Sequence, residues 1–295
     1  MESHASAEPA ATWAPSLSPL ATGFRPLAMA APDEFDAACS VRARIRAGLV
    51  SGHTAGLAPG LVQANLVVLP ASLAEAFRDY CRLNPGACPL LAQTAPGDPH
   101  PVALGRDIDV RTDLPMYRIW RAGRLAEERA DVRELWRPDL VSFILGCSFS
   151  FEEQLLRAGI PLRHLRAGRN VAMYRTGVAT RPAGPFRGPL VVSMRPVPRT
   201  DVERAAAISA RLPHAHGAPV HIGDPAVLGI GDLARPDYGD PETVGPDEVA
   251  VFWACGVTSQ AAIEAARPDF SITHKPGHML ITDLANELCA MSARS

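Results

Sequence analysis

Residues able to transfer protons or hold a ligand gather in three short clusters near the C-terminal end of the chain. Each cluster follows a short apolar run and contains Gly or Pro, which restrict the backbone of a loop. The clusters are His216–Pro225, Ala254–Gln260 and Thr273–Asp283. In an open α/β sheet, ligands bind beyond the carboxyl ends of the strands, so three such loops are expected to meet at one site. The pattern predicts the rim of an active site.

The third cluster contains two histidines, His274 and His278, separated by Pro276 and Gly277. We expect His274 at the end of a strand and His278 at the start of a helix over residues 279–291. Either imidazole is a candidate general acid or base. On one continuous helix the two would share a face and suit a metal ion. The intervening Pro-Gly disfavours that arrangement, and we predict no metal site.

The first two clusters offer further catalytic candidates. His221 is a third candidate to move a proton, beside His274 and His278, and Asp224 could orient one of these histidines. Cys255 lies at a strand-to-helix turn, where a helix N-terminus favours the thiolate, although an inert buried cysteine is the competing interpretation. Thr258 is expected near the start of that helix, where free N–H groups could receive a substrate carboxylate.

Acidic and basic residues in the middle of the chain complete the candidate set. Glu152, in the motif Gly146–Glu152, is either a functional carboxylate or a first-turn residue favoured by the helix dipole. Arginines in strands and tight turns act as clamps on carbonyls and acids or as bidentate carboxylate binders. We expect Arg111 and Arg195 to contact an anionic substrate.

Strands and helices alternate in the last third of the chain, and Val249–Ala254 is a continuous apolar run. This alternation and the apolar run favour a buried, largely parallel sheet. We predict an α/β fold in two parts. A discontinuous main α/β domain spans residues 31–105 and 215–295, and a smaller α+β module is inserted at 106–214. Residues 1–30 are expected to be a disordered tail.

Composition narrows the functional classes. The 295 residues carry a net charge of −2 and are 47% hydrophobic. Neither a nucleic acid nor a membrane is an expected partner, and the scattered cysteines and absent signal pattern predict a cytoplasmic protein. No P-loop or dinucleotide fingerprint is present, so we expect no cofactor. A small-molecule carboxylate or amino acid is the expected partner. Whether the chain forms a homo-oligomer is left open.

Several longer motifs resemble those of a known bacterial family. They are Thr54–Gly60 with Gln63–Asn65, Asp107–Pro115, Gly146–Glu152, Arg181–Gly184, His216–Pro225, Phe252–Thr258 and Pro276–Leu280. From about residue 40 to its C-terminus, the chain resembles the hydro-lyase family, also called the D-glutamate cyclase family. The resemblance implies a two-part α/β fold and a carbon–oxygen lyase. Lys275 departs from the small residue expected there, and residues 1–30 fall outside the resemblance.

The family name implies a reaction that can be compared with the residues. A larger relative closes D-glutamate to 5-oxo-D-proline with loss of water. That reaction needs a base for the amine, donors for an oxyanion, an acid for the departing hydroxide and a cation for the second carboxylate. Two alternatives stay open, a non-catalytic protein that binds small carboxylates and a metal-assisted hydrolase.

Overall fold

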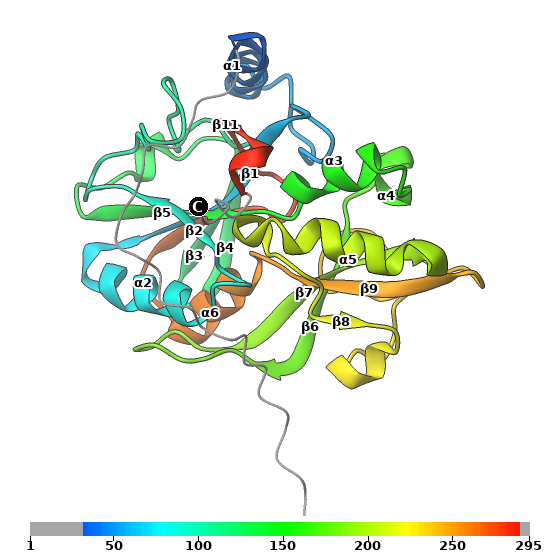
Figure 1. The fold of residues 1–295 in the computed structure, drawn as a ribbon. Helices are drawn as coiled ribbons and strands as arrows, with labels where there is room; N and C mark the ends of the chain where they lie inside the picture. Colours follow the sequence, from blue (N-terminus) through cyan, green and yellow to red (C-terminus); the bar gives the residue numbers. More distant parts are fainter. Residues whose placement is uncertain (1–31, 290–295) are drawn as a thin grey trace, which may run out of the picture.

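A computed structural model describes residues 32–289 and shows two β-sheets with helices packed against them (Figure 1). The first sheet has the strand order β2-β5-β1-β10-β3-β4, with β11 also paired to β1. Its strands are β1 (Leu61–Pro70), β2 (Leu90–Gln93), β3 (Tyr117–Arg121), β4 (Arg124–Arg129), β5 (Leu140–Gly146), β10 (Ser271–His274) and β11 (Leu280–Ala285).

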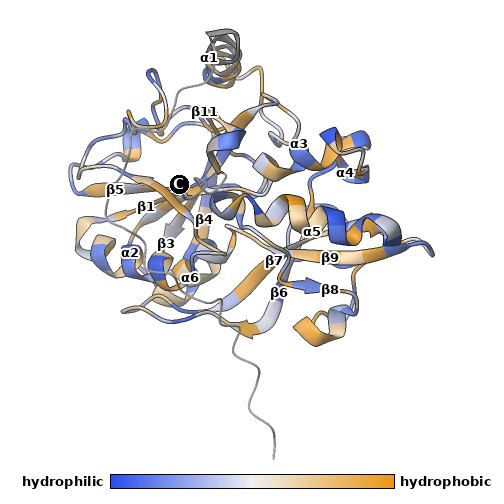
Figure 2. Ribbon diagram, in the orientation of Figure 1, coloured by the Kyte–Doolittle hydropathy of each residue, from blue (hydrophilic) through white to orange (hydrophobic). Residues whose placement is uncertain are grey.

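The second sheet has the strand order β6-β7-β9-β8. Its strands are β6 (Ala172–Ala179), β7 (Pro189–Pro198), β8 (His221–Ile222) and β9 (Glu248–Ala254). The α-helices of the described residues are α1 (Pro32–Arg46), α2 (Ala74–Leu83), α3 (Phe149–Arg157), α4 (Arg163–Arg166), α5 (Val202–Ala210) and α6 (Thr258–Ala266). Figure 2 shows apolar colour along β7 and β9, beside α5.

The α/β class is confirmed, but the prediction of a largely parallel sheet is wrong. Every strand pairing between the named strands is antiparallel. The apolar run in β9 misled the prediction because continuous apolar sequence reports burial on both faces, whatever the strand direction. On one face, Trp253 packs in the core that contains α3 and α5, and on the other Phe252 packs in the core that contains α2 and α6.

Strand β1 divides the protein into these two cores. Its side chains alternate, so that Leu66 and Val68 face the core with α3, while Val67 and Leu69 face the core with α2. The same alternation turns two polar side chains, Gln63 and Asn65, inward, and both are buried. Buried amides require hydrogen-bond partners, so the central strand carries polar groups that its surroundings must satisfy.

The predicted helix over residues 279–291 is wrong within the described residues. Residues 280–285 form β11, and Asn286–Cys289 form a 3₁₀ turn. Strand β11 pairs with β1, placing Leu280 opposite Ala64. Sheet pairing outweighed the helical spacing of apolar residues, because a central strand offers an entire edge of backbone partners.

Strands β3 and β4 form a hairpin, and Ala122 and Gly123 adopt the positive φ values that its tight turn requires. The proposed domain boundaries stay a prediction. Each sheet takes strands from both sides of these boundaries. The predicted tail, residues 1–30, lies outside the described residues.

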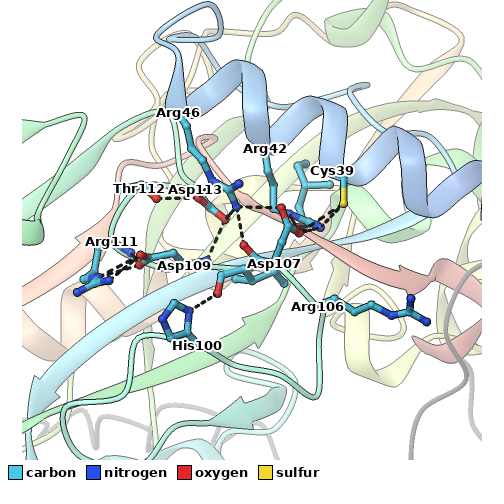
Figure 3. A network of polar contacts seen from close by, with 12 residues as sticks. Cys39, Arg42, Arg46, His100, Arg106, Asp107, Asp109, Arg111, Thr112 and Asp113 are labelled. Atoms are coloured by element: carbon cyan, nitrogen blue, oxygen red, sulfur yellow. Dashed lines mark hydrogen bonds and ion pairs between the residues drawn. The ribbon is translucent and has the colours of Figure 1, made fainter.

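Helix α1 is fastened to the first sheet by two arginines (Figure 3). Buried Arg42 donates to the carbonyl of Ile281 at 2.9 Å, to Asp283 at 2.6 Å, and to Asp107. Arg46 forms a bidentate pair with buried Asp113, both distances being 2.6 Å. The guanidinium groups therefore join the helix to β11 and to the motif at 107–115.

No helix among residues 32–289 combines the length and the apolar character that a membrane span requires.

Replacing Arg42 with Leu is expected to lower the free energy of unfolding by about 3–5 kcal/mol, because Asp283 would be left buried without its cation. Arg44→Leu, at an exposed position on the same helix, is the matched control and should change it by less than about 0.5 kcal/mol. Urea unfolding of both variants measures the difference. Equal effects of the two substitutions would contradict this account of α1.

Candidate active site

The motif loops meet where a strand is interrupted. Strands β10 and β11 lie along the same edge of β1, with Thr273 opposite Val67 and Leu280 opposite Ala64. Between them, Lys275–Met279 leaves the sheet at the level of Asn65. Thus β10 and β11 together resemble one strand from which a five-residue loop is ejected.

The side chain of Asn65 holds two other motif segments at this point. The amide of Asn65 donates to the carbonyl of Gly146 at 2.6 Å. Gly256 faces the same amide so closely that a Cβ there would lie 2.2 Å from Asn65 Nδ2. The turns that follow β5 and β9 therefore both contact Asn65, although they are more than a hundred residues apart in the sequence.

The ejected loop is held by the segment that precedes β1. The backbone N–H of Thr54 donates to the carbonyl of Gly277 at 2.8 Å, and its hydroxyl accepts from the N–H of Met279 at 3.0 Å. Gln63 donates its amide to the carbonyl of Thr54 at 3.0 Å. These bonds explain the loop's fixed position without any ligand.

His274 occupies the gap that the ejected loop leaves in the sheet. Its Nδ1 lies 3.2 Å from both the N–H and the carbonyl of Leu66, the backbone groups that a continuous strand would pair. Burial lowers the pKa of His274 to about 3, so the ring is neutral at neutral pH. Its Nε2 is buried and has no hydrogen-bond partner among the described residues.

His278 presents a lone pair from the ejected loop. Its Nδ1 lies 3.2 Å from the carbonyl of Pro276, and because a carbonyl only accepts, Nδ1 carries the proton. In the neutral ring Nε2 is then a proton acceptor. Burial lowers the pKa of His278, with the nearby Lys275 acting in the same direction. The imidazole is therefore held as a neutral base.

Glu152 and Arg195 form a buried pair that the sequence did not predict as a pair. Arg195 Nε and Nη2 lie 2.9 and 2.5 Å from Glu152 Oε1, and His164 Nε2 lies 3.0 Å from the same oxygen. Burial alone would raise the pKa of Glu152, but the positive charge of Arg195 outweighs it and, with His164, lowers the pKa to about 2. His164 has no motif that would have revealed it.

The contacts of Arg195 support a structural role. Its guanidinium is fully buried, lies over the rings of Phe151 and Trp253, and also donates to Ser148 at 3.0 Å. It thereby fixes the turn between β5 and α3. A substrate-binding role for Arg195 and Glu152 stays a prediction, and their bonds to each other use the groups that such a role would need.

Cys255 and Thr258 lie together at the start of α6. The Thr258 hydroxyl donates to the carbonyl of Cys255 at 2.7 Å and accepts from the N–H of Val191 at 3.0 Å. Burial raises the pKa of Cys255 to about 11 and also raises that of nearby Cys147, so both thiols are protonated at neutral pH. The thiolate that the helix N-terminus was expected to favour is not supported.

The structure does not bring His221 and Asp224 into contact with these groups. His221 Nε2 donates to the carbonyl of Asp224 at 2.7 Å, and its ring lies against Phe252. The carboxylate of Asp224 accepts from the N–H of Ala226 and so caps the short turn Pro225–Leu228. The hydrogen bonds of His221 and Asp224 stay within residues 221–226, and catalytic roles for the two residues stay predictions.

Arg111 lies in a different region, beside α1. It forms a bidentate pair with Asp109, with Nη2 2.8 Å from Oδ2 (Figure 3). An open cleft of about 450 Å³ is found there, and its lining includes Arg46, Asp107, Asp109, Thr112, Asp131 and Arg133. Arg111 is thus tied to an acid beside the cleft, and its predicted substrate role remains untested.

The acids of this cleft are poorly suited to proton transfer near neutral pH. Burial disfavours the charged form of Asp109, but hydrogen bonds from Arg111 outweigh that effect and lower its pKa. A hydrogen bond from Arg133 lowers the pKa of Asp131. Both carboxyls are therefore fully ionised, whereas the loop at 275–279 holds a neutral imidazole. We place the candidate site at that loop.

Among residues 32–289, no group of three or more His, Cys, Asp and Glu side chains is arranged to hold a metal ion.

The fold and the motif-lined loop define an α/β protein with a neutral histidine at the junction of several motifs. Comparison with known proteins identifies the class further. The sequence profile described as D-glutamate cyclase matches residues 141–283. A relative from Bordetella petrii is 60% identical over 252 residues, which cover 85% of this chain and 96% of the relative. The chain belongs to the D-glutamate cyclase family.

Further relatives have the same kind of name. A protein from Verminephrobacter eiseniae is 58% identical, covering 88% of this chain and 95% of its own length. One from Methylobacterium radiotolerans is 56% identical, covering 85% and 93%. All three bear the provisional name of a hydro-lyase. A solved nitrogen repressor-like protein from Methanococcus jannaschii aligns with a TM-score of 0.35 and 11% identity, too low to support an argument.

Replacing Glu152 with Gln is expected to lower the free energy of unfolding by about 3–5 kcal/mol, because Arg195 would be left buried without its counter-ion. Glu203→Gln, at an exposed position on α5, is the control and should have little effect. Chemical denaturation of the two variants tests this. A Glu152→Gln protein as stable as the wild type would show that the pair does not hold the turn.

The buried histidines predict that stability falls as the pH is lowered. Burial lowers the folded-state pKa of His216 to about 4 and that of His274 to about 3, whereas both titrate near 6.5 when unfolded. From pH 6.5 down to about 4.5, the unfolded chain therefore binds protons that the folded chain does not, and stability decreases.

Urea midpoints measured from pH 7.5 to 4.5 test this effect, and His216→Asn should flatten the profile. An unchanged midpoint across that range would contradict neutral, buried imidazoles. Loss of the Glu152 charge is a separate effect that begins only below about pH 4.5, the ordinary pKa of that carboxyl, and is complete below its folded pKa of about 2.

Proposed function

We propose that this protein is a hydro-lyase that acts on a small amino acid or carboxylate, with His278 as its proton-transfer residue. The observation that carries the proposal is the neutral imidazole of His278, whose Nδ1 is bonded to Pro276 and whose Nε2 is left as a base. Family membership supports the reaction class, and the relatives' hydro-lyase names support loss of water.

D-glutamate closing to 5-oxo-D-proline is the reaction that we propose to test first. The α-amine attacks the γ-carboxyl carbon, a C–N bond forms, and a C–O bond breaks. The ammonium group gives up two protons in the process, and the departing oxygen leaves with two protons as water. One acid/base residue can therefore accept a proton from nitrogen and return it to oxygen, and His278 is assigned that role.

The surroundings of His278 offer a cation for a substrate carboxylate. Lys275 lies within electrostatic range of His278, and its side chain is partly exposed. Its Nζ lies 2.6 Å from Glu128, which Arg118 also contacts. A substrate carboxylate would replace or share these contacts. In this proposal Lys275 acts as a counter-ion, and Arg111 and Arg195 keep their protein partners.

His278→Asn is expected to lower turnover of D-glutamate by at least about 100-fold, the usual contribution of a general acid or base. Proton NMR of the reaction, followed from D-glutamate and from 5-oxo-D-proline, measures it. His100→Asn is the control, since His100 is exposed and bonds to the carbonyl of Ile108 beside α1.

The other outcomes distinguish the alternatives. Loss of turnover in His221→Asn but not in His278→Asn would move the proton-transfer role to β8. Binding without turnover would favour a carboxylate-binding protein. Turnover that appears only with an added divalent metal ion would favour a metal-assisted reaction. Each result would overturn the assignment to His278.

A further inference from the structure

Three side chains surround the turn at Pro276 and Gly277 and have acceptor atoms that the protein does not use. His278 Nδ1 donates to the carbonyl of Pro276 at 3.2 Å, and so does the amide of Asn170, at 3.2 Å. His53 is the residue before Thr54, whose N–H bonds Gly277 at 2.8 Å. Segments from three distant parts of the sequence thus meet at one turn.

The orientation of each side chain is fixed by the bond that it donates. His53 Nε2 lies 3.0 Å from the carbonyl of Gly168, so Nε2 carries the proton and Nδ1 of the neutral ring is an acceptor. Asn170 donates with Nδ2, which leaves Oδ1 as an acceptor. Both His53 Nδ1 and Asn170 Oδ1 are buried and lack a partner among the described residues.

Burying an acceptor without a donor is unfavourable, so the arrangement needs an explanation. Close packing does not allow Asn170 to turn away freely. A Cβ at position 277 would lie 2.4 Å from Asn170 Nδ2 and 2.7 Å from Oδ1, so the amide lies directly on Gly277. The turn has a positive φ of 86° there, which also favours glycine.

We propose that His53 Nδ1, Asn170 Oδ1 and His278 Nε2 form the subsite for the amino group of an amino-acid substrate. An ammonium group has three N–H donors and no acceptor, which matches three unpaired acceptors. A carboxylate or phosphate at the same place would meet only lone pairs. The assignment rests on the proposed hydro-lyase function and adds to it, since it selects amino acids over simple carboxylates and places the nitrogen beside His278.

The test compares D-glutamate with glutarate, the same dicarboxylate without the amino group. Binding of each to the 295-residue chain is measured by ligand-observed NMR titration. The wild type should bind D-glutamate at least about tenfold more tightly than glutarate, as expected for hydrogen bonds to a charged group. His53→Leu and Asn170→Leu should each remove most of that preference and leave glutarate binding unchanged.

His100→Leu is the matched control for His53→Leu, since it removes an exposed imidazole beside α1, and it should keep the preference. Circular dichroism and a thermal melt confirm that each variant is folded. Gly277→Ala gives a second, independent perturbation, because its methyl group must displace the Asn170 amide. It should weaken D-glutamate binding more than glutarate binding.

Three outcomes would overturn the subsite. They are equal binding of the two ligands, no binding of either, and binding of Zn²⁺ alone that His53→Leu abolishes, which would assign the acceptors to a metal ion. The proposed function fails separately. If His278→Asn abolishes turnover while His53→Leu and Asn170→Leu leave the preference for D-glutamate unchanged, the function stands and the subsite falls.

Discussion

The structure depends on how the backbone hydrogen bonds along the two edges of β1 are satisfied. One edge is paired with β5 from Ala64 to Pro70, and the other is shared by β10 and β11, which separate beside Asn65. An unpaired backbone group buried at the centre of a sheet is costly, and the imidazole of His274 lies against both free groups of Leu66. A side chain thus replaces backbone pairing, and the ejected loop is free to carry His278.

The remaining polar core can be understood as support for that interruption. Asn65 bonds the turn after β5 and packs against Gly256 in the turn after β9, while Thr54 bonds the ejected loop. Arg195 fixes the start of α3 through its bonds to Glu152 and Ser148. A buried ion pair adds little net stability compared with an apolar core, so its use here fits a need for a defined position. That position is the one in which the motif loops meet.

Part of this arrangement could be predicted from the sequence and part could not. The Pro-Gly pair between His274 and His278 correctly indicated that the two imidazoles do not share a helix, because those residues break one locally. The strand after His278 was missed, since residues 280–285 have spacing that suits a helix and only pairing with a distant strand decides the matter. Asn170 was missed for a related reason, because its partner Pro276 is far away in the chain. His164 was missed because its contact with Glu152 depends on how the chain turns back after α3. Antiparallel direction was also invisible, since burial on both faces gives the same apolar run either way.

The protonation state of His278 is the most direct test of the account. Long-range ¹H–¹⁵N NMR of the histidine side chains at pH 7, with His278→Asn used for assignment, reports which ring nitrogen carries the proton. The account predicts a neutral ring with the proton on Nδ1, bonded to Pro276, and a bare Nε2 that titrates below the ordinary value of 6.5. An imidazolium at pH 7, or a neutral ring with its proton on Nε2, would contradict it.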